Sequence, residues 1–446
     1  MRIVRDLEAA KSLLLERSSL ELAADTPALK QRIRDVFSQE LTPDEVVRRI
    51  IREVRARGDS ALFDYGRRID GVELTRLEVT QEEIAESRNV VGKELMSALE
   101  LAAERVRSFH VAQKRNLGLE FVEGGLGFLV RPLERVGIYV PGGKASYPST
   151  VLMTAIPARV AGVDEVVVAT PPALDGTVSA ATLAAAGIAG VDRVFKVGGA
   201  QAVAAMAYGT ESVPRVDKIC GPGNIFVTLA KKQVYGTVAI DGLHGPTETV
   251  ILADDSASPV FCAADLLAQA EHDEMASAVL ITTSPRLADE VGEEVERQLT
   301  DLERQAIARQ SLENNGAIVV VAGIDEAIEL VNLRAPEHLC LVMKDARSYL
   351  DRIRHAGGIF IESPEALGDY TAGPSHVMPT GGTARFSSPL SVLDFLKVSI
   401  LVDLDDEALK ALGPASASIA RAEGLSAHAL SVERRLEDLE RGGPGK

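Results

Sequence analysis

Glu337 and His338 stand side by side in the segment NLRAPEHLC, directly after a proline that ends the preceding predicted helix. Neighbouring side chains point in different directions, so the two groups would act on two different protons. Such a pair suits a reaction with two separate proton transfers. A helix end with incidental charge would also produce this pattern, so the segment alone leaves both interpretations open.

A second group of polar residues has the composition of a metal site. Three segments each supply two donors: Gln269 and His272, Asp369 and His376, and Glu423 and His428. We expect the first two to share one helix face, the next two to lie on a loop after a strand, and the last two to flank a helix start. Imidazole and oxygen donors without thiolate suit zinc or another borderline divalent ion. A histidine beside a carboxylate is also common at ordinary positions, so spacing alone does not decide.

Glycine-rich turns follow several predicted strands, at Pro141-Gly142-Gly143, Gly198-Gly199 and Gly221-Pro222-Gly223-Asn224. Ligands of open parallel sheets lie at the carboxyl ends of the strands, and helix N-termini there suit pyrophosphate. Tyr139 could stack on a ring, while Gln201 and Asn224 could hydrogen-bond a ribose or an amide. The GxGxxG fingerprint of dinucleotide sites is absent, and tight turns need glycine in any case. Pattern alone therefore does not separate a cofactor site from ordinary turns.

The elements that would position these residues alternate between short β-rich runs and alanine-rich helical runs. Predicted strands lie at 136–140, 164–170, 192–197 and 216–220, and a second series lies at 249–254, 278–283, 316–322, 338–343 and 357–362. We expect a helix near 150–159, another near 178–186 and one long charged helix near 285–310. This alternation predicts an α/β fold with two Rossmann-like, doubly wound parallel sheets.

The domain organisation follows from these series. We expect 1–138 and 241–385 to form a main α/β domain, with 139–240 as an inserted Rossmann-like domain that carries the glycine-rich turns. Residues 1–110 read as mostly helical and should pack on the second series. Residues 386–446 should form a small helical tail, with helices at 404–423 and 425–441, although the segment SVLDFLKVSI could be strand or helix. Because the tail has little core of its own, it must pack on this subunit or another.

Composition excludes several classes of partner. The chain has 446 residues, a net charge of −17 and three widely spaced cysteines. Nucleic acids and anionic membrane surfaces both require a surplus of Lys and Arg on one face, so we expect neither as a partner. The cysteine pattern suits a reducing compartment. Since no apolar signal segment or membrane-spanning run is present, we expect a cytoplasmic protein.

The chain resembles the histidinol dehydrogenase family over essentially its whole length. The matching segments occur in family order: GIYVPGG (137–143), KVGGAQAVAAMAYGT (196–210), KICGPGN (218–224), GPTETVILAD (245–254), LLAQAEHD (266–273), APEHL (335–339), ALGDYTAGPSHVMPTGGTARFSSPLSV (366–392) and EGLSAHALSV (423–432). The family oxidises L-histidinol to L-histidine in two NAD-linked steps through an aldehyde. Its members are zinc enzymes and homodimers whose C-terminal tail reaches the partner's active site.

The resemblance implies a role for each matching residue. Proton transfer would fall to Glu337 and His338. Zinc ligands would be Gln269, His272, Asp369 and His428, and NAD contacts would be Tyr139, Gln201 and Asn224. The substrate would contact His338, the zinc ligands, and also Thr247, His376 and Glu423. Glu423 and His428 would come from the other subunit, so the homodimer would share its active sites.

Two departures from the family pattern bear on the substrate. Thr247 replaces the usual serine but keeps the hydroxyl, and His244 stands where a small residue is usual. A bulky, ionisable neighbour could reshape the pocket, so a paralogous zinc- and NAD-dependent dehydrogenase for another polar alcohol, such as a sulfonated diol, is the alternative. A zinc hydrolase using Glu337 would leave the glycine-rich turns without a role, and a binding module without catalysis would tolerate loss of His338.

Overall fold

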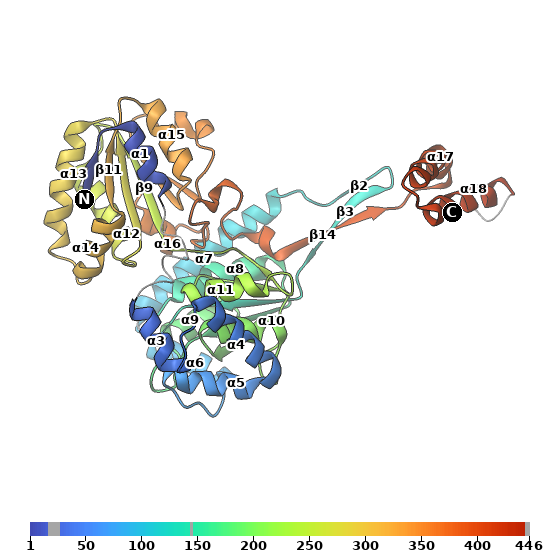
Figure 1. Ribbon diagram of the computed structural model, residues 1–446, viewed down its shortest axis with the longest axis horizontal. Coiled ribbons are helices and arrows are strands. Elements are labelled where there is room, and N and C mark those ends of the chain that lie inside the picture. Colours follow the sequence, from blue (N-terminus) through green and yellow to red (C-terminus); the bar gives the residue numbers. More distant parts are fainter. Residues whose placement is uncertain (17–26, 143–145, 442–446) are drawn as a thin grey trace. The chain divides into compact units, whose positions relative to one another are not determined.

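The computed structural model describes residues 1–16, 27–142 and 146–441 (Figure 1). Gly143 of the first glycine-rich turn lies outside these residues. The chain divides into two compact units, the larger formed by Met1–Lys114 and Leu133–Phe395 and the smaller by Arg115–Pro132 and Leu396–Lys446. Across the described ranges, no helix has the length and apolar character needed to span a membrane.

The first parallel sheet of the larger unit has the strand order β6-β5-β4-β7-β8. Its strands are β4 (Arg135–Tyr139), β5 (Glu165–Thr170), β6 (Arg193–Lys196), β7 (Lys218–Cys220) and β8 (Ala239–Ile240). The connecting helices are α8 (Pro148–Ala161), α9 (Ala180–Ala189), α10 (Gly199–Tyr208) and α11 (Ile225–Val234). The predicted strands and the two predicted helices are confirmed. Chain order reverses between β4 and β7, which is the point where doubly wound sheets bind ligands.

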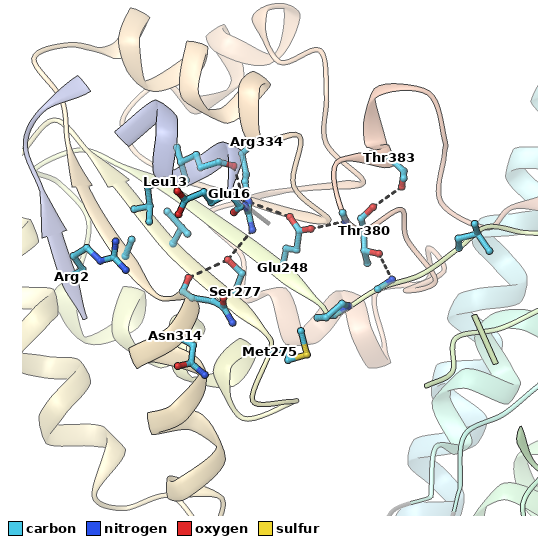
Figure 2. Close-up of a pocket in the computed structure, with 18 residues that line it drawn as sticks. Arg2, Leu13, Glu16, Glu248, Met275, Ser277, Asn314, Arg334, Thr380 and Thr383 are labelled. Carbon is cyan, nitrogen blue, oxygen red and sulfur yellow. Dashed lines mark hydrogen bonds and ion pairs between the residues drawn. The ribbon is translucent and has the colours of Figure 1, made fainter. Parts of the chain in front are cut away.

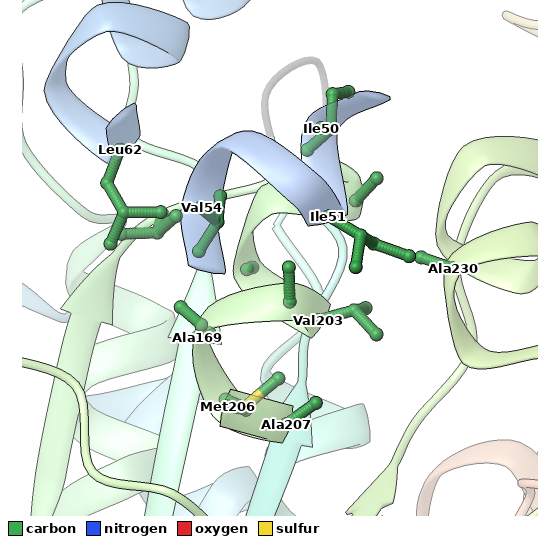
Figure 3. Close-up of a cluster of buried hydrophobic side chains, with 14 of the residues drawn as sticks. Ile50, Ile51, Val54, Leu62, Ala169, Val203, Met206, Ala207 and Ala230 are labelled. Atoms are coloured by element: carbon green, nitrogen blue, oxygen red, sulfur yellow. The ribbon is translucent and has the colours of Figure 1, made fainter. Parts of the chain in front are cut away.

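The N-terminal helices largely pack on the helices that belong to this first sheet, and not on the second sheet as the sequence predicts. They are α3 (Pro27–Phe37), α4 (Pro43–Arg57), α5 (Asp59–Tyr65), the π-helical turn η1 (Gly66–Asp70), α6 (Gln81–Val90) and α7 (Lys93–Asn116). Figure 3 shows the reason, because Ile50, Ile51 and Val54 of α4 lie against the alanine-rich helix α10. Small side chains on α10 let α4 approach closely, and both apolar faces are buried.

The second parallel sheet has the order β1-β11-β10-β9-β12-β13. Its strands are β1 (Arg2–Val4), β9 (Glu248–Ala253), β10 (Ser277–Thr282), β11 (Ala317–Val320), β12 (His338–Val342) and β13 (Gly358–Ile361). Alternate residues face two separate cores: Ile251 packs with α12 (Pro259–Ala270) and α13 (Pro285–Leu299), and Val250 packs with α1 (Leu7–Leu15) and α15 (Ile324–Arg334). Burial of both faces explains the continuous apolar runs that identify these strands in the sequence.

The single long helix expected near 285–310 is wrong. The structure has two helices there, α13 and α14 (Gln305–Asn315), separated by a turn that begins at the C-cap Thr300. The turn lets α14 pack on α12 and β10, so that Leu312 joins the core formed by α12 and α13. Tertiary packing therefore interrupts a charged segment whose periodicity is helical throughout.

The smaller unit combines a three-stranded antiparallel sheet with two helices. Strand order is β14-β3-β2, with β2 (Phe121–Glu123), β3 (Leu126–Pro132) and β14 (Leu396–Val402), followed by α17 (Asp406–Ala422) and α18 (Ser426–Glu440). The segment that could be strand or helix forms a 3-10 turn at Val392–Phe395 and then β14. Both predicted tail helices are confirmed. Pairing with β14 brings Arg115–Pro132 into this unit.

Candidate active site

Glu337 and His338 lie at the amino end of the second sheet. Helix α15 ends at Arg334, Ala335 adopts a left-handed conformation with φ of 47°, and Pro336 precedes the pair. His338 is the first residue of β12 and stands in register with Thr249 of the neighbouring strand β9. These two strands meet where chain order reverses in the sheet. The side chains expected to transfer protons therefore lie at the opposite end of the strands from the usual ligand site of such sheets.

The carboxylate of Glu337 is buried and held in one orientation. Its Oε2 accepts hydrogen bonds from Thr247 Oγ1 at 2.5 Å and from the backbone amide of Glu248 at 3.0 Å. Gln269 Nε2 in turn donates to Thr247 Oγ1. Burial raises the pKa of Glu337 above its usual range, although the His338 charge and the Thr247 hydrogen bond oppose the shift. A carboxylate with a raised pKa is a better proton acceptor than a solvated one.

His338 is also buried, with 3% of its surface exposed, but it faces a different set of groups. Its ring packs edge-on against Phe360, and Nε2 lies 3.6 Å from Asp369 Oδ1. Burial by itself would lower the pKa of His338, whereas the interaction with Asp369 and the charges of Glu337 and Glu365 raise it to about 9. The neighbouring carboxylates therefore stabilise the protonated form of this imidazole.

Asp369 lies on the short helix α16 (Glu365–Tyr370), and not on a loop as the sequence predicts. The turn of helix reverses the chain after β13 and brings Asp369 back to His338. His376 does lie on the loop that follows: its Nδ1 is 2.8 Å from the Asp369 carbonyl oxygen, and its Nε2 is 3.4 Å from Thr150 Oγ1 of α8. Burial would raise the pKa of Asp369, but His338 outweighs it and lowers the value.

The residues expected to bind zinc are only partly brought together in the larger unit. Gln269 lies on the last turn of α12, and His272 lies just beyond that helix instead of on a shared face, with its amide bonded to the Gln269 carbonyl at 3.3 Å. His272 is close enough to Asp369 for its charge to contribute to the lowered pKa of that carboxyl. Among the described residues, no three His, Cys, Asp or Glu side chains converge as metal ligands.

The donor chemistry of this group nevertheless fits zinc. Gln269 uses its amide nitrogen to donate a hydrogen bond to Thr247, which leaves the amide oxygen as a possible metal ligand. His272 offers an imidazole nitrogen and Asp369 a carboxylate, and zinc binds all three kinds of group. A fourth ligand would have to come from elsewhere. Both predicted tail residues, Glu423 and His428, are exposed in the smaller unit at the turn between α17 and α18.

Glu365 is a functional candidate that the sequence reasoning missed. Its carboxylate is 1% exposed, accepts a hydrogen bond from Thr249 Oγ1 at 2.7 Å and lies 3.6 Å from Cys340 Sγ. Burial raises its pKa to about 7, against the opposing charge of His338. Its position four residues before Asp369, which places both on one face of a helix, is the signal that could have identified it.

A cavity of about 720 Å³ opens at the same amino ends of the strands (Figure 2). Glu248, whose backbone amide binds Glu337, contributes its side chain to the wall. That side chain pairs with Arg334 at 3.3 Å and accepts a hydrogen bond from the Gly381 amide at 2.6 Å. Arg334 also donates to Ser277 Oγ at 3.0 Å. Arg334, Glu248 and Ser277 therefore form a buried polar network next to Glu337.

The residues expected to contact NAD lie at the carboxyl ends of the first sheet. Tyr139 ends β4, and its hydroxyl accepts a hydrogen bond from the Gly199 amide at 3.1 Å. Both side-chain polar atoms of Gln201, in the first turn of α10, are buried and make no hydrogen bond among the described residues. Asn224 is the N-cap of α11, where its Oδ1 accepts from two backbone amides. All three flank the glycine-rich turns predicted from the sequence.

Comparison with known proteins identifies the family. The family model described as histidinol dehydrogenase matches residues 34–436. The histidinol dehydrogenase of Dehalococcoides mccartyi strain CBDB1 is 52% identical over 441 residues, which cover 98% of this chain and 100% of the relative. The chain belongs to the histidinol dehydrogenase family. The histidinol dehydrogenase of Deinococcus radiodurans is 51% identical over 442 residues, with the same two coverages of 98% and 100%.

A solved histidinol dehydrogenase has the same fold. The crystal structure of the enzyme from Elizabethkingia anophelis superimposes with a TM-score of 0.89 at 35% identity and covers 98% of both chains. The family resemblance, the α/β fold with two parallel sheets and a helical tail, and the expected enzyme class are thereby confirmed. The protein is a dehydrogenase of the histidinol dehydrogenase type, and its family places it in histidine biosynthesis.

Proposed function

We propose that this protein oxidises L-histidinol to L-histidine through histidinal, using two NAD molecules and one zinc ion. The observation that carries the proposal is the pair of adjacent, buried, separately held proton acceptors. Glu337 is held by Thr247 and Glu248, while His338 faces Asp369. A conversion of an alcohol to a carboxylate needs a base for the alcohol and a second base for the water that adds to the aldehyde.

Each residue has a definite task in this reaction. His338 accepts the proton of the alcohol, and the surrounding carboxylates stabilise the imidazolium that forms. Glu337 accepts a proton from the water that adds to the aldehyde carbon. Thr247 and the Glu248 amide hold Oε2 of the Glu337 carboxylate in place, so Oε1 would be the atom that accepts the proton. The burial of both side chains and their separate partners support these roles.

The cofactors and the second subunit complete the proposal. NAD, when bound, accepts a hydride in each oxidation, and zinc, when bound, orients the imidazole and amine of the substrate. Gln269, His272 and Asp369 would hold the metal together with His428 of a second copy. Glu423, which is exposed in the smaller unit, would pair with the substrate amine from the same second copy. We therefore propose a homodimer with shared active sites.

His244 bears on the choice between L-histidinol and another polar alcohol such as a sulfonated diol. Its Nδ1 lies 3.0 Å from the Met378 carbonyl oxygen, and its Nε2 lies 3.3 Å from Asp241 Oδ2. The two ring nitrogens thus face the Met378 carbonyl and the Asp241 carboxylate, and neither faces Glu337 or His338. This geometry supports L-histidinol, because the unusual residue is engaged at the Asp241–His244 segment instead of the proton-transfer pair.

The decisive experiment measures NADH formed per L-histidinol consumed by the purified protein, before and after treatment with a zinc chelator. We expect two NADH per histidinol, loss of turnover after chelation and recovery on addition of zinc. No NADH from histidinol, with NAD still bound, would reject L-histidinol and favour another alcohol. Turnover that survives complete removal of metal would reject the zinc assignment.

A further inference from the structure

Asp70 is a partly buried carboxylate at the end of a short helical turn. It ends the π-helical turn η1, and Gly71 after it reverses the chain with φ of 71°. Asp70 makes no hydrogen bond or ion pair with any residue in the described ranges. Burial raises its pKa to about 6, with Arg32 opposing the shift only through its charge. Holding a charge in such a place costs folding free energy, and residues of this kind are frequent in functional sites.

The turn that carries Asp70 packs beside the predicted cofactor site. Ile69, the preceding residue, contacts the apolar cluster that contains Tyr139 and Ala200. The chain that follows Asp70 runs beside β6, where the Lys196 amide donates to the Leu77 carbonyl oxygen at 2.7 Å, and β6 leads into the Gly198-Gly199 turn. The charge of Asp70 also contributes to the raised pKa of Tyr139. Tyr139 in turn accepts a hydrogen bond from the Gly199 amide. Asp70 therefore belongs to the surroundings of the Gly198-Gly199 turn, although it is distant in sequence.

An independent feature of the same turn indicates a ligand. Gln201 is 1% exposed, and its Oε1 and Nε2 make no hydrogen bond among the described residues. Its amide faces the start of α10, because a Cβ on Gly199 would lie 2.9 Å from Gln201 Oε1. Gly199 has φ of 62°, a conformation that favours glycine, and it carries no side chain next to the Gln201 amide. The buried amide of Gln201 and the carboxylate of Asp70 would together offer both donors and acceptors to a ligand of this turn.

We propose that Asp70 is a further cofactor-binding residue, which accepts hydrogen bonds from the vicinal hydroxyls of a ribose of the bound dinucleotide. This inference rests on the proposed NAD-dependent function and adds a residue to that site. A carboxylate is the group that matches two neighbouring ribose hydroxyls, and it repels a ribose phosphate. If the bound ribose is that of adenosine, Asp70 also favours NAD over NADP.

The test compares three forms of the full-length protein by calorimetric titration with NAD. The variants are Asp70→Asn, which keeps the size of the side chain, and the matched control Asp64→Asn. Asp64 lies on α5 and interacts with Arg57, Arg67 and Arg68, so it is already paired. We expect Asp70→Asn to weaken NAD binding by about tenfold to a hundredfold, the effect of one hydrogen bond to a charged group. Asp64→Asn should bind NAD like the wild type.

Two further measurements identify the ribose that Asp70 contacts and test for a purely structural role. Competition by AMP and by nicotinamide mononucleotide identifies the ribose, because the half that contacts Asp70 should lose affinity for Asp70→Asn. Without NAD, the melting temperature of Asp70→Asn at pH 7.5 should equal or exceed that of the wild type, since an unpaired charge is removed. A lower melting temperature would instead give Asp70 a structural role and overturn the inference.

Failure of the inference and failure of the proposed function give different results. Equal NAD affinity of the wild type and Asp70→Asn would overturn the role of Asp70 and leave the proposed function intact. A wild type that binds no NAD would overturn both.

Discussion

At the scale of single residues, adjacent positions in the chain have different environments. Glu337 is held by a hydroxyl and a backbone amide, and burial raises its pKa. His338 faces Asp369 and packs on Phe360. Because the strand directs the two side chains to different surroundings, one dipeptide supplies two proton acceptors with separate tasks.

The two tasks predict different defects for Glu337→Gln and His338→Gln. Glu337→Gln should slow the oxidation of histidinal by about 10²–10⁴-fold, because the base for the added water is lost, and should affect the first oxidation much less. Single-turnover measurement of NADH should therefore show one rapid equivalent followed by a slow second one. His338→Gln should slow the first equivalent itself. Equal losses in both steps for both variants would contradict the assignment.

At the scale of elements, the helices preceding the first sheet derive their stability from buried apolar faces. Leu62 of α5 is 2% exposed and packs in the cluster of Figure 3, whereas Leu101 of α7 is 54% exposed. Leu62→Ala should lower the free energy of unfolding by about 2–5 kcal/mol, from lost transfer energy and the cavity left behind. Leu101→Ala should change it by less than about 0.5 kcal/mol. Urea denaturation of both variants checks this, and similar midpoints would contradict the packing.

A buried ion pair fixes the turn that follows β7. Lys231 of α11 pairs with Asp241 and donates to the Gly221 carbonyl at 3.0 Å, and Asp241 accepts from the Gly221 amide at 2.7 Å. Burial would raise the pKa of Asp241, but Lys231 and His244 lower it below its usual range. The pair therefore connects the glycine-rich turn carrying Asn224 to the segment that leads to Thr247.

Removing one partner of this pair should be costly. Asp241→Asn leaves Lys231 buried and unpaired, and we expect a loss of about 3–5 kcal/mol at neutral pH. Because the folded pKa of Asp241 is lowered, its contribution is complete above the unfolded value of about 4 and is lost as pH falls below it. Urea unfolding at several pH values should show this acid dependence in the wild type and its reduction in Asp241→Asn. The exposed pair of Arg5 and Asp289 is the control, and Asp289→Asn should have no comparable effect.

At the scale of the whole molecule, the smaller unit leaves much apolar surface uncovered within one chain. Ile400 is 77% exposed, Val402 62% and Ile419 61%. Exposed apolar side chains in such number are typical of surfaces that contact another protein. This exposure supports the proposal that the tail, with Glu423 and His428, completes the active site of a second copy.

Shared sites predict that two inactive variants can restore activity together. In a mixed dimer of His338→Ala and His428→Ala subunits, one of the two sites receives both intact residues. Unfolding and refolding an equal mixture should recover about a quarter of wild-type activity, because half of the dimers are mixed and each has one working site. Each variant refolded alone should remain inactive. Absence of recovery, with dimers confirmed by light scattering, would place both residues in the same subunit's site.

The sequence by itself determined the α/β class, the strands, the tail helices and the residues that could transfer protons or bind ligands. These features depend on local pattern, since short continuous apolar runs mark buried strands and glycine marks tight turns. Only the tertiary structure decided that α4 and α6 pack on the helices of the first sheet, that 285–315 contains two helices, and that Asp369 lies on a helix turn. The same holds for Glu365 and Asp70, whose significance lies in the groups around them. Burial and missing partners are properties of residues that meet only when the chain is folded, so no periodicity in the sequence records them.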